Sequence, residues 1–159
     1  MTGVIIQSDG TQWWVVGTIS GTTPPTARQG VATGIVTTTQ NVYVGLLDGP
    51  DVDVIVPASG QVILILTGEL SGSSQANGDA CSTAYMSVSL NNSDIVLDAN
   101  SLRVTGNVPN RASITVLITG LTPGVPINFA ARYKNIGLAG RAACGPARFN
   151  ARQIIVIPN

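Results

Sequence analysis

The sequence predicts an all-β protein, an antiparallel jelly-roll-like β-sandwich that carries an N-terminal β-hairpin arm. Apolar residues nowhere keep a helical spacing, whereas short β-branched runs bounded by Gly, Pro, Asn and Asp recur along the whole chain. Hydrophobic residues make up 44% of the 159 residues but aromatic residues only 4%, so Val, Ile, Leu and Ala must fill the core. Such side chains suit layered sheets, and the length suits one domain with an appendage.

Strands are expected from one end of the chain to the other. Tight turns are indicated between them, for example at Ser8-Asp9-Gly10, Asn91-Asn92-Ser93 and Thr122-Pro123-Gly124. Short strands at this spacing favour a sandwich or barrel. The predicted strands are Gly3–Gln7, Gln12–Ile19, Thr33–Thr38, Val42–Leu47, Asp51–Val56, Gln61–Leu70, Ala84–Leu90, Ile95–Leu97, Ser101–Val104, Ala112–Gly120, Pro126–Tyr133 and Ala151–Ile157.

A boundary is predicted at Ser20–Gly30, where Gly21-Thr22-Thr23-Pro24-Pro25-Thr26 should break any strand and form an extended linker. We therefore divide the chain into a hairpin arm with its linker (residues 1–30) and a sandwich domain (residues 31–159).

The hairpin arm holds both tryptophans, Trp13 and Trp14, next to each other. Adjacent strand residues point to opposite faces, and an isolated two-stranded hairpin is only marginally stable in water. The hairpin therefore needs a partner, which is either its own domain or a neighbouring protein. Because Trp is a preferred interface anchor, Trp13, Trp14, Ile5 and Val15 are the candidate partner-binding residues.

Charged residues are scarce and unevenly placed. They make up 10% of the chain, against about a quarter in ordinary soluble proteins, which favours burial of part of the surface in an oligomer. Residues 1–99 hold all eight acidic residues and one basic residue, Arg28, whereas residues 100–159 hold seven basic and no acidic residues. The basic residues are spaced singly, without the clusters and aromatic neighbours typical of nucleic-acid binding, so no nucleic-acid partner is expected.

No membrane partner is expected either. The longest apolar runs are far shorter than the roughly 18 residues that a membrane-spanning helix requires. The N-terminus also lacks the basic and hydrophobic regions of a secretion signal, so we expect synthesis in a cytoplasm.

The sequence offers few residues that could support catalysis. The chain has no histidine, which excludes Ser-His-Asp, Cys-His and His-metal sites, and its single lysine, Lys134, has no Ser-x-x-Lys spacing. Glu69 and the cluster of Asp48, Asp51 and Asp53 are the remaining candidates for a carboxylate pair or a calcium site, but the cluster does not match the EF-hand pattern. We expect no catalytic residues, no metal and no cofactor, and solvated loop carboxylates instead.

The two cysteines, Cys81 and Cys144, are not spaced as a metal site or a redox motif. A reducing cytoplasm argues against a disulfide between them and an extracellular destination argues for one, so the sequence leaves both states open.

From about Val31 to the C-terminus the chain resembles a β-sandwich module of virion proteins in phages that infect actinobacteria, itself similar to the trimeric jelly rolls of the tumour-necrosis-factor and complement type. It departs from that pattern at Gly137–Asn150, where an Arg- and Ala-rich segment replaces the usual Gly/Thr-rich turn. The blocks that carry the resemblance are Val54-Ile55-Val56-Pro57-Ala58-Ser59-Gly60-Gln61-Val62, Ala84-Tyr85-Met86-Ser87-Val88, Gly120-Leu121-Thr122-Pro123-Gly124, Phe129-Ala130-Ala131-Arg132-Tyr133-Lys134 and Arg152-Gln153-Ile154-Ile155-Val156-Ile157-Pro158.

The resemblance implies a homotrimeric virion protein, made in the host cytoplasm. Small stand-alone size favours a capsid decoration protein that binds the major capsid protein on the outer head surface. The alternative is a minor tail or tail-tip protein that binds the host surface, which the scarcity of aromatic residues disfavours. A cell-wall glycosidase using Glu69 is the least favoured interpretation.

Overall fold

The computed structural model describes residues 2–8, 13–20, 26–95, 101–141 and 144–159; for 2–8, 13–20 and 94–95 it describes the backbone alone. Every regular element in these ranges is a β-strand, so none of the described residues belongs to a helix that could cross a membrane. The strands are β1 (Thr2–Ser8), β2 (Trp13–Ser20), β3 (Arg28–Ala32), β4 (Val36–Thr38), β5 (Asp51–Ile55), β6 (Val62–Ser71), β7 (Ser82–Leu90), β8 (Asp94–Ile95), β9 (Leu102–Thr105), β10 (Asn110–Ile118), β11 (Pro126–Gly137) and β12 (Ala147–Pro158).

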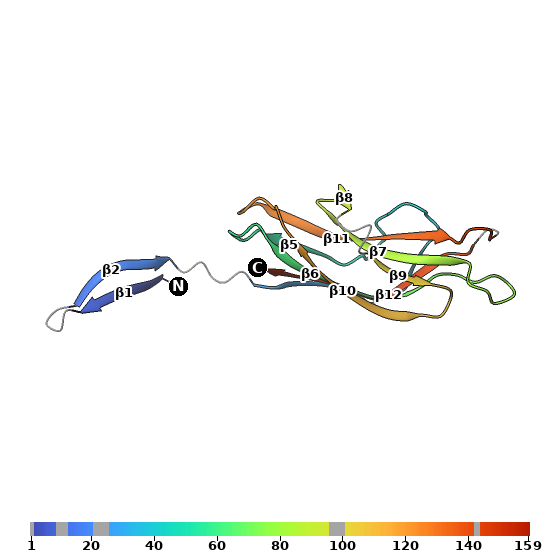
Figure 1. Ribbon diagram of the computed structural model, residues 1–159, viewed down its shortest axis with the longest axis horizontal. Helices are drawn as coiled ribbons and strands as arrows, with labels where there is room; N and C mark the ends of the chain where they lie inside the picture. Colours follow the sequence, from blue (N-terminus) through green and yellow to red (C-terminus); the bar gives the residue numbers. More distant parts are fainter. Residues whose placement is uncertain (1, 9–12, 21–25, 96–100, 142–143) are drawn as a thin grey trace.

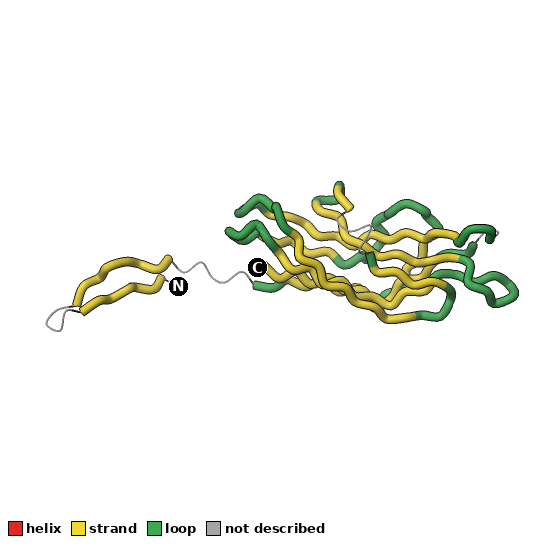
Figure 2. The backbone as a smooth tube through the Cα atoms, in the orientation of Figure 1, coloured by secondary structure: helices red, strands yellow, loops and turns green. Residues whose placement is uncertain are grey.

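Two five-stranded antiparallel sheets face each other and form a sandwich (Figures 1 and 2). The first, which we call the β6 sheet, has the order β10-β6-β12-β3, with β4 also pairing with β12. The second, the β11 sheet, has the order β5-β11-β7-β8, with β9 also pairing with β7. Strands that are distant in sequence lie side by side, as in a jelly roll, and the predicted fold class is confirmed.

Alternating side chains build the core between the sheets. In β6, Val62, Leu64, Leu66 and Leu70 are fully buried, while Ile63, Ile65, Thr67 and Glu69 point away from the core. Aliphatic side chains fill most of the interior, as the composition predicts. The larger aromatic side chains meet near its centre, where the rings of Tyr133 and Phe149 are 4.8 Å apart in an edge-on arrangement.

The structure differs from the predicted strands at the start of the sandwich. Strand β3 begins at Arg28, inside the segment predicted to be linker, and the predicted boundary at residue 31 falls within it. The prediction missed β3 because it is a mostly polar edge strand held by backbone pairing with β12, without a hydrophobic alternation of its own. Gly30 permits its close approach to β5, since a Cβ there would collide with the carbonyl oxygen of Asp51.

Two other predicted strands are shorter than expected. Of Thr33–Thr38 only β4 is a strand, and Val42–Leu47 contributes a single bridge, between Val44 and Tyr133. The chain here runs beside β11 beyond the end of β5 and bonds irregularly, at Gln40, Val44 and Pro50, rather than as a regular ladder.

A bulge in β12 turns Arg152 into the core. The register with β6 shifts between Asn150 and Gln153, and Ala151 takes a left-handed backbone with φ of 44°. Arg152 is fully buried; its Nη2 donates to the carbonyl of Gly34 (2.8 Å) and its Nη1 to the hydroxyl of Tyr133 (3.3 Å). No carboxylate among the described residues lies within ion-pairing distance of it, so the cation is held by neutral groups alone.

Candidate functional site

The predicted N-terminal hairpin is present as a separate two-stranded sheet of β1 and β2 (Figure 1). The strands pair from Thr2 opposite Ser20 to Ser8 opposite Trp13, with one register shift between Ile5 and Ile6. Trp14 pairs with Gln7.

The backbone places the four candidate partner-binding residues together in this hairpin. Trp13, Trp14 and Val15 begin β2, and Ile5 lies in the middle of β1. Their side chains fall outside the part of the chain that the structure describes, so their contact with a partner stays a prediction.

A second candidate surface lies on the outward side of the β6 sheet, where sequence reasoning did not place one. Register aligns Leu117, Ile63 and Ile157 in one row across β10, β6 and β12, and Ile65 lies opposite Ile155 in the next row. The isoleucines are half-buried within the chain, and Leu117 is 52% exposed. We call the surface formed by Ile63, Ile65, Leu117, Ile155 and Ile157 the isoleucine face.

The isoleucine face is unusual for a sandwich, because the outer side of an antiparallel sheet is normally polar. Farther along the same strands the outward residues do become polar: Thr67 lies opposite Ser113, with their hydroxyl oxygens 2.9 Å apart. The apolar surface is therefore confined to one end of the sheet.

A signal for this face was present in the sequence. The runs Val62-Ile63-Leu64-Ile65-Leu66 and Ile154-Ile155-Val156-Ile157 are continuously apolar, a pattern typical of strands buried on both sides. The core covers one side of each strand, and the pattern predicts that something covers the other.

The hairpin arm joins the sandwich at the same end. Arg28, the first residue of β3, pairs with Val156, and Gln29 pairs with Ile155. The chain that leads from the hairpin therefore enters the β6 sheet at the corner nearest Ile157.

The carboxylates considered for catalysis lie on different sheets. Glu69 points outward from β6 and accepts a hydrogen bond from Asn150 Nδ2 (3.2 Å), whereas Asp51 and Asp53 are exposed on β5. Because they lie on the outer sides of opposite sheets, Glu69 and these aspartates cannot face each other across one cleft. Among the described residues no group of three or more Cys, Asp and Glu is placed to hold a metal ion.

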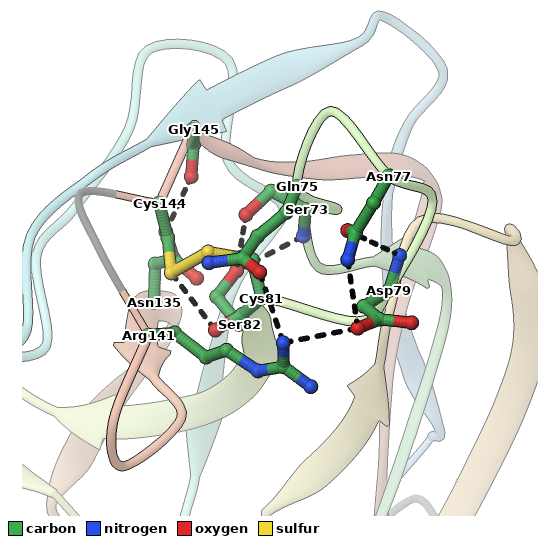
Figure 3. The surroundings of a disulfide bond; sticks show 10 residues. All are labelled: Ser73, Gln75, Asn77, Asp79, Cys81, Ser82, Asn135, Arg141, Cys144 and Gly145. Carbon is green, nitrogen blue, oxygen red and sulfur yellow. Dashed lines mark hydrogen bonds and ion pairs between the residues drawn. A yellow bond between two sulfur atoms is a disulfide. The ribbon is translucent and has the colours of Figure 1, made fainter.

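Cys81 and Cys144 form a disulfide, which settles the question that the sequence left open (Figure 3). Cys81 immediately precedes β7, and Cys144 lies three residues before β12, so the bond ties the loop before β7 to the loop before β12. The bond closes a sequence separation of 63 residues.

Polar contacts reinforce the same pair of loops (Figure 3). Arg141 forms an ion pair with Asp79 (3.1 Å) and donates to Gln75 Oε1 (2.9 Å). Within the first loop, the buried hydroxyls of Ser73 and Ser82 are 2.9 Å apart. The disulfide and the ion pair therefore join the same two loops at this end of the sandwich.

Comparison with one solved structure supports the fold. A chain in the structure of infectious bursal disease virus Gx strain is similar over 97% of this chain, with a TM-score of 0.52 and 14% sequence identity. The present chain spans 37% of that chain's length. The CBM22-1 xylan-binding domain from Paenibacillus barcinonensis Xyn10C matches 87% of this chain at 12% identity, with a TM-score of 0.27.

The similarity to the chain from the virus structure shows a shared fold. At 14% sequence identity it shows nothing about function. No family model and no curated protein matches the sequence.

Proposed function

We propose that the chain is a structural protein of a bacteriophage virion, namely a capsid decoration protein bound to the outer head surface. The observation that carries this proposal is the pair of surfaces described above, the isoleucine face and the tryptophan-bearing hairpin. One surface suits contact between copies of this chain, and the other suits contact with the underlying shell.

The occupant we assign to the isoleucine face is a second copy of this chain, in a homotrimer. The isoleucine face covers three strands at about 4.8 Å spacing and about four residues at about 3.3 Å each, roughly 190 Å² in projection, so it would form the apolar centre of a standard interface of about 800 Å² per partner. The low content of charged residues also favours self-association.

The hairpin is assigned to the major capsid protein. The hairpin forms a sheet of its own and is too small to be stable in isolation. The first two residues of its second strand are tryptophans, which are frequent interface anchors. An arm joined to the sandwich by a short segment can lie on a neighbouring protein while the sandwich stays above the shell.

The test is addition of the purified chain to phage heads that lack it. The full chain should co-sediment with heads at saturation, and a chain without residues 1–25, which keeps β3 complete, should remain folded but fail to co-sediment. Retained head binding by the shortened chain would show that the hairpin is not the anchor. If the full chain binds purified tails instead of heads, the protein is a tail component.

A further inference from the structure

A polar depression lies on the outward side of the β11 sheet, on the opposite side of the sandwich from the isoleucine face. Its volume is about 310 Å³, at the lower end of the range of small-molecule sites. Ala130 contributes a small side chain, Arg132 and Asn128 extend from the same strand, and Asp51 and Asn92 approach from β5 and the loop after β7.

Arg132 is held in a fixed position at this depression. Its Nε donates to Ser89 Oγ (2.8 Å) and its Nη2 donates to Asn92 Oδ1 (2.7 Å). The remaining nitrogen, Nη1, points toward Gly45, where a Cβ would collide with it. Gly45 therefore allows the guanidinium to lie against this wall, and Nη1 donates no hydrogen bond to another residue in the described part of the chain, so its two hydrogens remain for a ligand.

Two loops form the walls, and both are fastened to β11. Asn91 donates its backbone N–H to the carbonyl of Asn128, and its side-chain oxygen accepts from the Asn128 N–H, each at 2.9 Å. On the other side, Val44 pairs with Tyr133, and the ammonium of Lys134 lies 4.2 Å from the ring centre of Tyr43. Because both walls are anchored, the depression exists before any ligand arrives.

The walls also hold left-handed turn residues. Asp48, Asn91 and Asn92 have φ of 57°, 47° and 62°, and they are three of the four non-glycine residues with positive φ in the described part of the chain. Asp and Asn tolerate this conformation in tight turns, so the two loops keep a defined shape beside β11.

Acceptors stand near the Arg132 donor. Asn128 Nδ2 is committed to Asp53 (2.9 Å) and Asp51 (3.3 Å), which leaves Asn128 Oδ1 and the remaining carboxylate lone pairs to accept hydrogen bonds. Hydroxyl groups both donate and accept, so adjacent hydroxyls of one ligand match this set of donors and acceptors.

The charged residues around the depression determine which hydroxyl-bearing ligands it favours. Arg132 brings one positive charge to the lining, and Lys134, two residues farther along β11, brings another; Asp51 lines the depression, and Asp53 accepts a hydrogen bond from the lining residue Asn128. These charges balance, so an anionic ligand gains no net attraction, and a neutral ligand that is recognised through hydrogen bonds is favoured. We propose that this depression binds a neutral carbohydrate, through Arg132, Asn128 and Asp51.

The proposed function is not needed for this inference, which concerns a different surface. None of the described residues that line the depression is aromatic, so a single site should bind weakly, and several sites on one particle would bind a glycan-coated surface much more tightly.

The experiment is a printed array of neutral oligosaccharides, built from hexoses and N-acetylhexosamines, and acidic ones that carry sialic acid, uronic acid or sulfate. The labelled full chain should bind neutral glycans and not their acidic derivatives. Saturation-transfer NMR with the best-bound glycan then compares variants. Arg132→Gln and Asp51→Asn should each weaken binding by about 10- to 100-fold, the effect of losing one charged hydrogen bond.

The matched control is Arg103→Gln, which removes an exposed arginine from β9 of the same sheet and should leave glycan binding unchanged. Circular dichroism confirms that each variant is folded; if Arg132→Gln is not, Asp51→Asn decides. The proposal is overturned if no neutral glycan is bound, if acidic glycans are preferred, or if Asp51→Asn binds as the original chain does. Head binding is measured in a separate experiment. A chain that binds no glycan can therefore still be a virion protein, and a chain that does not bind heads can still bind glycans.

Discussion

Ile65 of β6 lies directly opposite Ile155 of β12, with both side chains on the outward side of their sheet. Core packing does not require apolar residues at these positions, because Leu64, Leu66, Ile154 and Val156 already fill the inward side. The pair is better explained by burial against another molecule.

A charge placed in the isoleucine face should therefore dissociate the oligomer without unfolding the sandwich. Ile155→Lys should convert a trimer to a monomer at micromolar concentration, measured by size-exclusion chromatography with light scattering, because an unpaired buried charge costs several kcal/mol.

The matched control is Ile55→Lys, the same substitution at an isoleucine that is 67% exposed on the outward side of the β11 sheet. It should remain a trimer. A monomeric original chain, or a trimeric Ile155→Lys, would contradict the assignment of this face to a second copy.

The hairpin tryptophans should act as anchors on the capsid. Replacing both Trp13 and Trp14 with Ala should weaken binding to heads by at least 2 kcal/mol, roughly 30-fold, since interface tryptophans are frequent hot spots. Leu47→Ala, at a residue 88% exposed in the sandwich, serves as the control and should bind normally. Unchanged occupancy in the double variant would remove the tryptophans from the interface.

The disulfide should contribute a large part of the sandwich's free energy of unfolding. Closing a 63-residue separation is expected to stabilise the fold by about 4 kcal/mol in the chain-entropy account. Urea unfolding should show a loss of that order on reduction, and the Cys81→Ser, Cys144→Ser double variant should match the reduced protein and not respond to reductant. Equal midpoints with and without reductant would mean that the bond contributes nothing.

Tyr133 should make the fold sensitive to alkaline pH. Burial raises the pKa of Tyr133 above its usual 10, and the nearby Arg152 guanidinium only partly opposes this. The folded state therefore favours the neutral phenol, so this contribution is complete below pH 10 and is lost as pH rises through the higher folded value.

Tyr133→Phe isolates that contribution. It should lower stability at pH 8 by about 1–3 kcal/mol, because Arg152 loses an acceptor, and should flatten the decline in urea midpoint above pH 10. An equally steep decline in the variant would show that other groups cause the alkaline sensitivity.

The fold could be predicted from local patterns, and the interaction surfaces only in part. Short apolar runs such as Val62–Leu66 and turn residues such as Thr122-Pro123-Gly124 predict strands and their ends without knowledge of what they pair with. β3 was missed because an edge strand held by its backbone carries no side-chain pattern.

The depression at Arg132 could not be predicted either. It depends on the approach of Gly45, Asn92 and Asn128 from three separate segments, and on a guanidinium oriented by two hydrogen bonds. The isoleucine face could be predicted in part. The sequence shows the continuous apolar runs, but only the strand register shows which of their side chains lie together on the uncovered side of the sheet.

The most direct test of the virion assignment is the copy number of this chain in purified particles, measured by quantitative mass spectrometry against the major capsid protein. Hundreds of copies per particle are expected for a protein that decorates the head lattice. A handful of copies would contradict decoration and place the protein at the tail or a single vertex, and its absence from particles would refute a structural role.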